Sequence, residues 1–188
     1  RAGKSTLLRH HFPEYKYVTL DDLDDLERSN EDPKGFIETL GDRFIIDEAQ
    51  RNPKLTLPLK KLIDERSVHF ILTGSYGLKL KEAVSDTLAG RIEIRELPPC
   101  CFGENHGDSL QTITGSGETI DRTASRALES FMAYGGFPEV LNAQNDHDKA
   151  EILKNYKNTY FTRDLAQLAA IENVEGLKSI YHALMKGI

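Results

Sequence analysis

The feature that most constrains this chain is the segment Gly3-Lys4-Ser5-Thr6, which leads directly into an apolar stretch compatible with a helix. A glycine lets the backbone approach a phosphate because no Cβ stands in the way. A lysine supplies a cation for the β- and γ-phosphates of a nucleotide, and the next hydroxyl is a ligand for Mg²⁺. Backbone N–H groups at a helix start add positive partial charge. The segment therefore matches the second half of the phosphate-binding pattern Gly-x-x-x-x-Gly-Lys-Ser/Thr, with Thr6 as a further donor to the α-phosphate.

This match has an ordinary alternative, in which Ser5 is simply the N-cap of a helix. The first glycine of the pattern, and the strand that normally leads into it, are expected before Arg1. The interpretation therefore depends on signals elsewhere in the chain.

A second signal is the segment 43–50, Arg-Phe-Ile-Ile-Asp-Glu-Ala-Gln. Its apolar run predicts a buried parallel strand. Asp47 and Glu48 follow at the carboxyl end of that strand, where open α/β sheets bind their ligands. This is the Walker B pattern, in which Asp47 holds Mg²⁺ through water and Glu48 orients and deprotonates the attacking water. An acidic pair in a turn means little alone, but its position about 40 residues after Lys4 favours the functional reading.

Three further segments are predicted to be strands. Residues 15–20 and 68–72 are rich in aromatic and β-branched side chains, and residues 92–97 alternate as a half-exposed strand does. Between the first of these and the Walker B strand, residues 21–27 hold five acidic side chains. We interpret this run as the solvated start of a helix that turns Leu20, Leu23 and Leu26 inward. The alternative is a metal site centred on Asp21.

Composition narrows the classes of function. A net charge of −6 argues against bulk electrostatic binding of nucleic acid. No apolar run approaches the roughly 20 residues that a membrane span needs. The adjacent cysteines Cys100 and Cys101 are unsuited to a relaxed disulfide or a zinc site, so we predict reduced thiols and a cytoplasmic location. The six histidines lack metal-ligand spacing and are predicted to be non-catalytic.

The chain divides by composition into three parts. Residues 1–102 hold the strands and motifs, residues 103–122 are rich in Gly, Ser, Thr and Asp and predict a linker or exposed loop, and residues 123–188 show only helical patterns. Within the last part, Gly135-Gly136 is expected to break a helix.

In this order, the motifs resemble those of prokaryotic AAA-type ATP-binding proteins that carry a C-terminal domain of unknown function. The resemblance implies an α/β fold of the P-loop NTPase type, with a parallel sheet in the order 5-1-4-3-2 flanked by helices. Strand 1 would be absent from this chain, and an all-helical segment would lead into a truncated C-terminal domain. The motifs that carry the resemblance are Gly-Lys-Ser-Thr, Leu-Asp-Asp (20–22), Ile-Ile-Asp-Glu-Ala-Gln-Arg (45–51), Leu-Thr-Gly-Ser (72–75), Leu-Ala-Gly-Arg (88–91), Gly-Gly-Phe-Pro-Glu (135–139) and Tyr-Phe-Thr-Arg-Asp (160–164).

The resemblance also implies roles for residues beyond the two main motifs. Thr73 and Ser75 stand where related ATPases place the polar group that senses the γ-phosphate, although turn chemistry explains them equally well. Arg91 stands where an arginine finger reaches the γ-phosphate of a neighbouring subunit, which implies a homo-oligomer. The alternative for Arg91 is an ion pair with Asp86 or Glu93. Arg163 and Asp164 match a motif that we interpret as a helix cap or a salt bridge between domains.

The prediction is an ATPase that binds Mg-ATP and uses hydrolysis to drive a conformational change on an unidentified protein client. One alternative is a non-hydrolysing ATP switch that recruits a protein or DNA partner. A P-loop small-molecule kinase is another alternative, but the Asp47-Glu48 pair and the all-helical tail argue against it. A GTPase is disfavoured because no Asn-Lys-x-Asp motif for reading guanine occurs.

Overall fold

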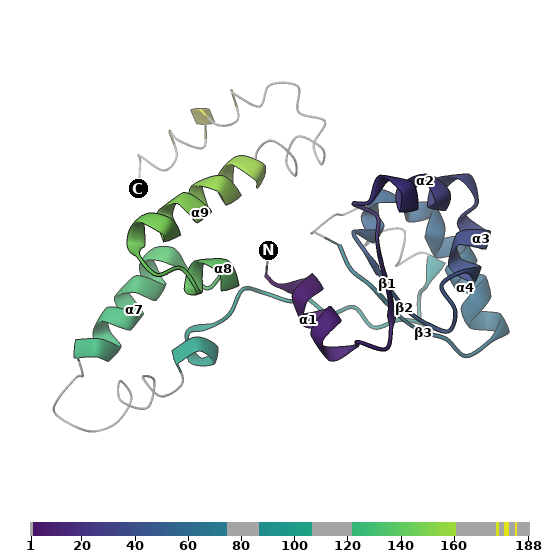
Figure 1. The fold of residues 1–188 in the computed structure, drawn as a ribbon, viewed down its shortest axis with the longest axis horizontal. Helices are drawn as coiled ribbons and strands as arrows, with labels where there is room; N and C mark the ends of the chain where they lie inside the picture. The colour runs from purple at the N-terminus through teal and green to yellow at the C-terminus, as the bar shows by residue number, and fades with distance from the viewer. Residues whose placement is uncertain are drawn as a thin grey trace. The chain divides into compact units, whose positions relative to one another are not determined.

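The computed structural model describes residues 2–74, 87–106 and 122–160, together with residues 176, 179, 180 and 183. The chain forms two compact units (Figure 1). One runs from Lys4 to Glu96, and the other combines residues 1–3 with residues 97–188. Of the predictions above, those for Ser75, Asp86, Arg163 and Asp164 and for the end of the chain lie outside the described residues.

The first unit is built on a sheet of three parallel strands in the order β1-β2-β3. The strands are β1 (Lys16–Thr19), β2 (Arg43–Asp47) and β3 (His69–Leu72). The central strand is the most buried, with Phe44, Ile45 and Ile46 each 0% exposed, as a parallel strand covered on both faces should be. The three predicted strands form and pair in parallel, but only the central strand is buried along its length: the residues of β3 are half-buried or exposed, which differs from the prediction of a buried strand. Their carboxyl ends share one edge of the sheet, which brings the residues after β2 and β3 together.

The predicted strand at 92–97 does not form, so this part of the expected five-stranded order is wrong for this structure. Residues 92–97 have no strand conformation and pair with none of β1, β2 and β3. Ile92 packs against the core, whereas Ile94 and Leu97 are 53% and 42% exposed. Alternation determines which side chains face the core, but a strand is stable only when a neighbouring strand accepts its hydrogen bonds.

Over residues 4–74, four α-helices and two 3₁₀ turns accompany the sheet. Side-chain caps explain two of the helix starts: Asp22 accepts from the backbone N–H groups of Asp24 and Asp25, and Asp32 accepts from that of Gly35. The core forms where α3, α4 and the sheet bring their apolar side chains together. The elements are α1 (Lys4–His11), α2 (Leu23–Glu31), α3 (Pro33–Glu38), η1 (Ala49–Arg51), η2 (Pro53–Leu55) and α4 (Thr56–Glu65).

The acidic run at 21–27 is the start of α2. Its Asp22 is the N-cap, and Leu20 is 0% exposed, which agrees with the solvated helix start. Leu26 packs against the core, but Leu23 is 73% exposed, so the prediction that it faces inward is wrong. Asp21 forms an ion pair with Arg51 at 2.5 Å. Over the described part of the chain, no three His, Cys, Asp or Glu side chains gather as a metal site.

The second unit contains α7 (Arg122–Tyr134), α8 (Pro138–Leu141) and α9 (Asp146–Thr159). The predicted break at Gly135-Gly136 is confirmed, because α7 ends at Tyr134 and Gly135 has φ +75°. The backbone N–H of Cys100 donates to the carbonyl of Gly136 at 2.8 Å, which fixes residues 100–106 beside α7. None of the described helices has both the length and the apolar character that crossing a bilayer requires.

Candidate functional site

The two main motifs meet at one hydrogen bond. Ser5, in the first turn of α1, donates from its hydroxyl to Oδ2 of Asp47 at 2.5 Å, although 42 residues separate the two in sequence. Asp47 is the last residue of β2 and is 4% exposed. The start of α1 therefore lies against the carboxyl end of the central strand.

Four donors surround the Asp47 carboxylate. Oδ2 accepts from the hydroxyls of Ser5 and Tyr17, and Oδ1 accepts from the hydroxyl of Thr73 and, at 3.0 Å, from the backbone N–H of Glu48. The donors come from α1, β1 and the turns that follow β2 and β3. A buried carboxylate is costly unless donors satisfy both oxygens. This network meets that condition and fixes the orientation of the carboxylate.

The network also sets the protonation of its members. Burial alone raises the pKa of Asp47, but hydrogen bonds from Ser5, Thr73, Tyr17 and the Glu48 backbone together hold that pKa below 3.8. Asp47 is therefore ionised at neutral pH. Burial, followed by the contact with the Asp47 carboxylate, raises the pKa of the Tyr17 phenol above 10.0. Tyr17 thus remains a hydrogen-bond donor to Asp47.

Glu48 has the left-handed conformation, with φ 55° and ψ 37°, and it precedes η1. Among the described residues it is the one non-glycine residue with positive φ. Such a conformation costs about 1–3 kcal/mol and is concentrated at functional sites. The side-chain amide of Gln50 donates to Oε2 of Glu48. The turn therefore fixes both the backbone and one carboxylate oxygen of Glu48.

The remaining residues of the first motif begin α1. Gly3 has φ +83°, a conformation that favours glycine, and α1 starts at the next residue. Lys4 is half-buried at the first position of the helix, whereas Thr6 is exposed in the same turn. The helix start therefore presents backbone N–H groups, a lysine and two hydroxyls in succession.

Thr73 and Ser75 are the two candidates for the polar group that senses the γ-phosphate, and the structure describes Thr73. Thr73 is 6% exposed and contacts Asp47 directly. Its backbone N–H donates to Ile46, and its carbonyl accepts from Ala49. Thr73 therefore belongs to the Asp47 network, while Ser75 lies beyond the described residues.

Arg91 has a partner that the sequence did not indicate. Its guanidinium contacts the carboxylate of Asp64, in α4, with Nε–Oδ1 at 2.9 Å and Nη2–Oδ2 at 3.3 Å. The hydrogen bond from Arg91 holds the pKa of Asp64 below 3.8. The suggested partner Glu93 instead pairs with Arg95 at 2.7 Å. An ion pair was the expected alternative for Arg91, but the residue that provides it lies 27 positions earlier in the chain.

Sequence reasoning missed three residues of the site. The sequence pattern predicts Tyr17 only as part of a strand, yet its hydroxyl contacts Asp47. Arg9, in α1, places its guanidinium carbon 4.0 Å from the centroid of the Tyr17 ring. Gln50 contacts Glu48. Tyr17 is paired with Ile45, two residues before Asp47, so strand periodicity alone does not place its hydroxyl at Asp47.

The donor set fits Mg²⁺ bound together with a nucleotide. Mg²⁺ in proteins usually takes one or two oxygen ligands from side chains and completes its shell with water and substrate phosphates. The Ser5 hydroxyl and the ionised Asp47 carboxylate are adjacent oxygen donors of this kind. The lysine at the start of α1 complements phosphate charge.

Comparison with known families identifies the class of protein. A family model described as an AAA domain matches residues 1–106, more than half of the chain, and the chain belongs to this family. A model described as a domain of unknown function (DUF8612) matches residues 125–187. The resemblance to AAA-type proteins with such a C-terminal domain is therefore confirmed. Membership indicates a nucleotide-binding domain of the ATPase type.

The relatives do not extend this assignment. Uncharacterized proteins of Mycobacterium tuberculosis and Mycobacterium bovis are each 31% identical over 171 residues, 89% of this chain and 35% of theirs. An uncharacterized protein of Methanocaldococcus jannaschii is 27% identical over 124 residues, 65% of this chain and 28% of its own. The chain thus spans about a third of the length of these curated relatives. No solved structure matches the chain.

Proposed function

We propose that the protein binds Mg-ATP at the start of α1 and hydrolyses it. The observation that carries this proposal is the 2.5 Å hydrogen bond between Ser5 and Asp47. A hydroxyl at a helix start and a buried, ionised carboxylate at the end of a central parallel strand form the pair that a nucleotide-bound Mg²⁺ requires. The neighbouring lysine and glycine match the phosphate-binding role.

Each residue of the site has a role in this proposal. Gly3, Lys4, Ser5 and Thr6 bind the phosphates, with Lys4 neutralising the β- and γ-phosphates. Ser5 and Asp47 hold Mg²⁺, which supplies positive charge to the phosphate oxygens when it is bound.

The chemical step is assigned to Glu48. Its carboxylate accepts a proton from the attacking water as the water oxygen bonds to the γ-phosphorus. The bond to the β-phosphate oxygen breaks, which releases ADP and phosphate. Thr73 fixes the Asp47 carboxylate, and the sensing of the γ-phosphate by Thr73 or Ser75 is part of the proposal.

The wider architecture is proposed on the same basis. The strands β1, β2 and β3 correspond to strands 2, 3 and 4 of the family sheet, which neighbour one another in the order 4-3-2. Residues 1–102 form the ATPase core, residues 103–122 a linker and residues 123–188 a helical segment. The protein would be cytoplasmic and would act on a protein client, with DNA as the alternative partner.

We also propose that Arg91 acts between subunits. Its guanidinium is held by one exposed carboxylate, and surface ion pairs of this kind are weak. A γ-phosphate from a neighbouring subunit, which carries more charge, would compete successfully with Asp64. This role of Arg91 requires that the protein forms a homo-oligomer.

Equilibrium binding of ATP to the full-length protein tests the first step. We expect Mg²⁺-dependent binding that is weakened at least about tenfold by Lys4→Ala and by Ser5→Ala, since each loses a charge-assisted or metal contact. Lys34→Ala is the matched control, because Lys34 is an exposed lysine whose partner is Glu38 in the same helix. Unchanged binding in Lys4→Ala and Ser5→Ala would exclude the site.

A further inference from the structure

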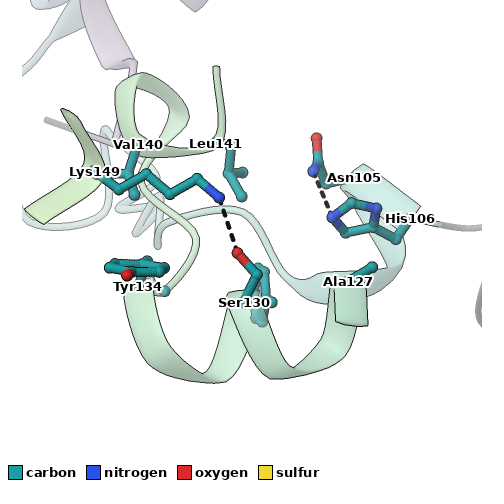
Figure 2. Close-up of a pocket in the computed structure, with 10 residues that line it drawn as sticks. Asn105, His106, Ala127, Ser130, Tyr134, Val140, Leu141 and Lys149 are labelled. Atoms are coloured by element: carbon teal, nitrogen blue, oxygen red, sulfur yellow. Dashed lines mark hydrogen bonds between the residues drawn. The ribbon is translucent and has the colours of Figure 1, made fainter. Parts of the chain in front are cut away.

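The second unit contains a pocket of about 220 Å³ that the proposed ATPase site does not use (Figure 2). Drug-sized ligands occupy pockets of about 300–1,000 Å³. A nucleotide is therefore too large for this cavity, which holds about seven groups the size of a water molecule. Its walls come from α7, α8, α9 and the segment before residue 107, and they consist of Asn105, His106, Ala127, Ser130, Phe131, Tyr134, Gly135, Val140, Leu141 and Lys149.

One wall presents a lysine with little access to water. The side chain of Lys149 is 18% exposed, and its ammonium donates to the hydroxyl of Ser130 at 2.9 Å. The ammonium also lies 5.3 Å from the centroid of the Tyr134 ring. Its nearest acid, Asp146, is 3.6 Å away, but that side chain is 73% exposed and well solvated. The ammonium has one hydrogen bond and one long ion pair among the described contacts, so with three donors it retains one for an incoming anion.

Hydrogen-bond direction strengthens this argument. An ammonium can only donate, so Ser130 accepts from Lys149 and keeps its own O–H to donate elsewhere. Figure 2 shows a second polar pair at another side of the pocket, in which Asn105 Nδ2 and His106 Nε2 are 2.9 Å apart. An amide nitrogen can only donate, so the ring nitrogen of His106 accepts in this pair. The donors available to a ligand are therefore the Lys149 ammonium and the Ser130 hydroxyl.

The rest of the lining determines what else the ligand carries. Ala127, Phe131, Val140 and Leu141 are apolar, so the body of the ligand is apolar and short. One lysine, partly balanced by Asp146, matches a single negative charge rather than the two of a phosphate.

We propose that this pocket binds a monocarboxylate with a short apolar body, its carboxylate accepting from Lys149 and Ser130. The carboxylate belongs either to a free acid or to the end of a peptide chain. This site is independent of ATP, and its test does not require the first motif to function.

Calorimetric titration of the full-length protein with hexanoate tests the proposal. We expect saturable binding that Lys149→Met weakens at least about tenfold and Ser130→Ala less, since only the lysine variant removes the charge that faces the carboxylate. Methionine keeps the apolar stem over Tyr134, and circular dichroism verifies folding. Lys154→Met, on the same helix with a 61% exposed side chain, is the control and should bind as wild type does.

Three competing probes complete the test. Hexanamide should bind at least about tenfold more weakly than hexanoate because it lacks the charge, and inorganic phosphate should bind more weakly as well. A short peptide that ends in leucine with a free carboxylate distinguishes the two sources of the carboxylate. If the peptide binds more tightly than hexanoate, the natural ligand is the end of a peptide chain. If it binds more weakly, the natural ligand is a free acid. The proposal is overturned if hexanoate does not saturate, if Lys149→Met binds it normally, or if hexanamide or phosphate binds equally well.

Discussion

Among single residues, Asp47 carries the strongest physical signature of the site. It is 4% exposed and accepts four hydrogen bonds, three of them from side chains that are distant in sequence. Removing its carboxylate would leave the buried hydroxyl of Thr73 without this acceptor, at about 1–3 kcal/mol for a buried unsatisfied group, and would remove the partner of the part-buried Ser5 and Tyr17 hydroxyls. The same contacts that would position a metal ligand therefore also stabilise the fold around it.

The depressed pKa of Asp47 predicts how stability depends on pH. Its ionised form is stabilised in the folded state, so this contribution is fully present above the unfolded value near 3.8 and is lost as pH falls through the lower folded pKa. In urea unfolding from about pH 5 to about pH 2, wild type should lose more unfolding free energy than Asp47→Asn, which has no carboxylate to protonate. Parallel losses in the two proteins would contradict the assigned pKa.

Tyr17 is predicted to fix the Asp47 carboxylate. Tyr17→Phe removes one hydrogen bond to a charged acceptor but keeps the ring that Arg9 contacts. We expect a loss of about 1.5–3 kcal/mol in unfolding free energy and a higher Mg²⁺ requirement for nucleotide binding. Tyr15→Phe is the control, because the ring of Tyr15, which this change keeps, lies in a tilted arrangement against that of Phe12. Equal stability of Tyr17→Phe and wild type would remove Tyr17 from the network.

Among the elements, α2 tests the interpretation of the acidic run. Asp22→Ala removes the acceptor for two backbone N–H groups and should cost about 0.5–2 kcal/mol, whereas Asp22→Asn keeps a capping oxygen and should cost less. Neither variant should change the Mg²⁺ dependence of ATP binding, because Asp22 acts as a cap. A large change in that dependence, measured by titration, would favour the alternative in which this acidic segment binds a metal ion.

The contact between α7 and residues 100–106 depends on Gly136. A Cβ at this position would lie 1.8 Å from the carbonyl oxygen of Cys100, so Gly136→Ala must move the backbone. Gly135→Ala is the comparison, since a Cβ there meets nothing within 4 Å and only the φ of +75° is unfavourable, at about 1–2 kcal/mol. Chemical denaturation should show a larger loss in Gly136→Ala than in Gly135→Ala. The reverse order would mean that this close approach does not stabilise the unit.

For the whole molecule, the sequence predicted the elements whose signals are local. Runs of apolar and β-branched side chains located β1, β2 and β3, and the acidic run at 21–27 located the start of α2. The segment at 92–97 was predicted wrongly because alternation cannot supply a pairing partner. The contacts of Tyr17 with Asp47 and of Arg91 with Asp64 depend on how distant elements pack, which spacing along one chain does not encode. The candidate site was thus predictable in its motifs but not in its supporting network.

The measurement that tests the central claim most directly is steady-state ATP hydrolysis by the full-length protein, compared with Glu48→Gln. We expect wild type to turn over ATP. Glu48→Gln should bind ATP normally and hydrolyse it at least about 10²-fold more slowly, because it cannot accept the proton from water. Asn30→Asp, an isosteric change at an exposed position of α2, should hydrolyse at the wild-type rate. Equal turnover by wild type and Glu48→Gln, or binding without turnover in wild type, would contradict the assigned chemistry.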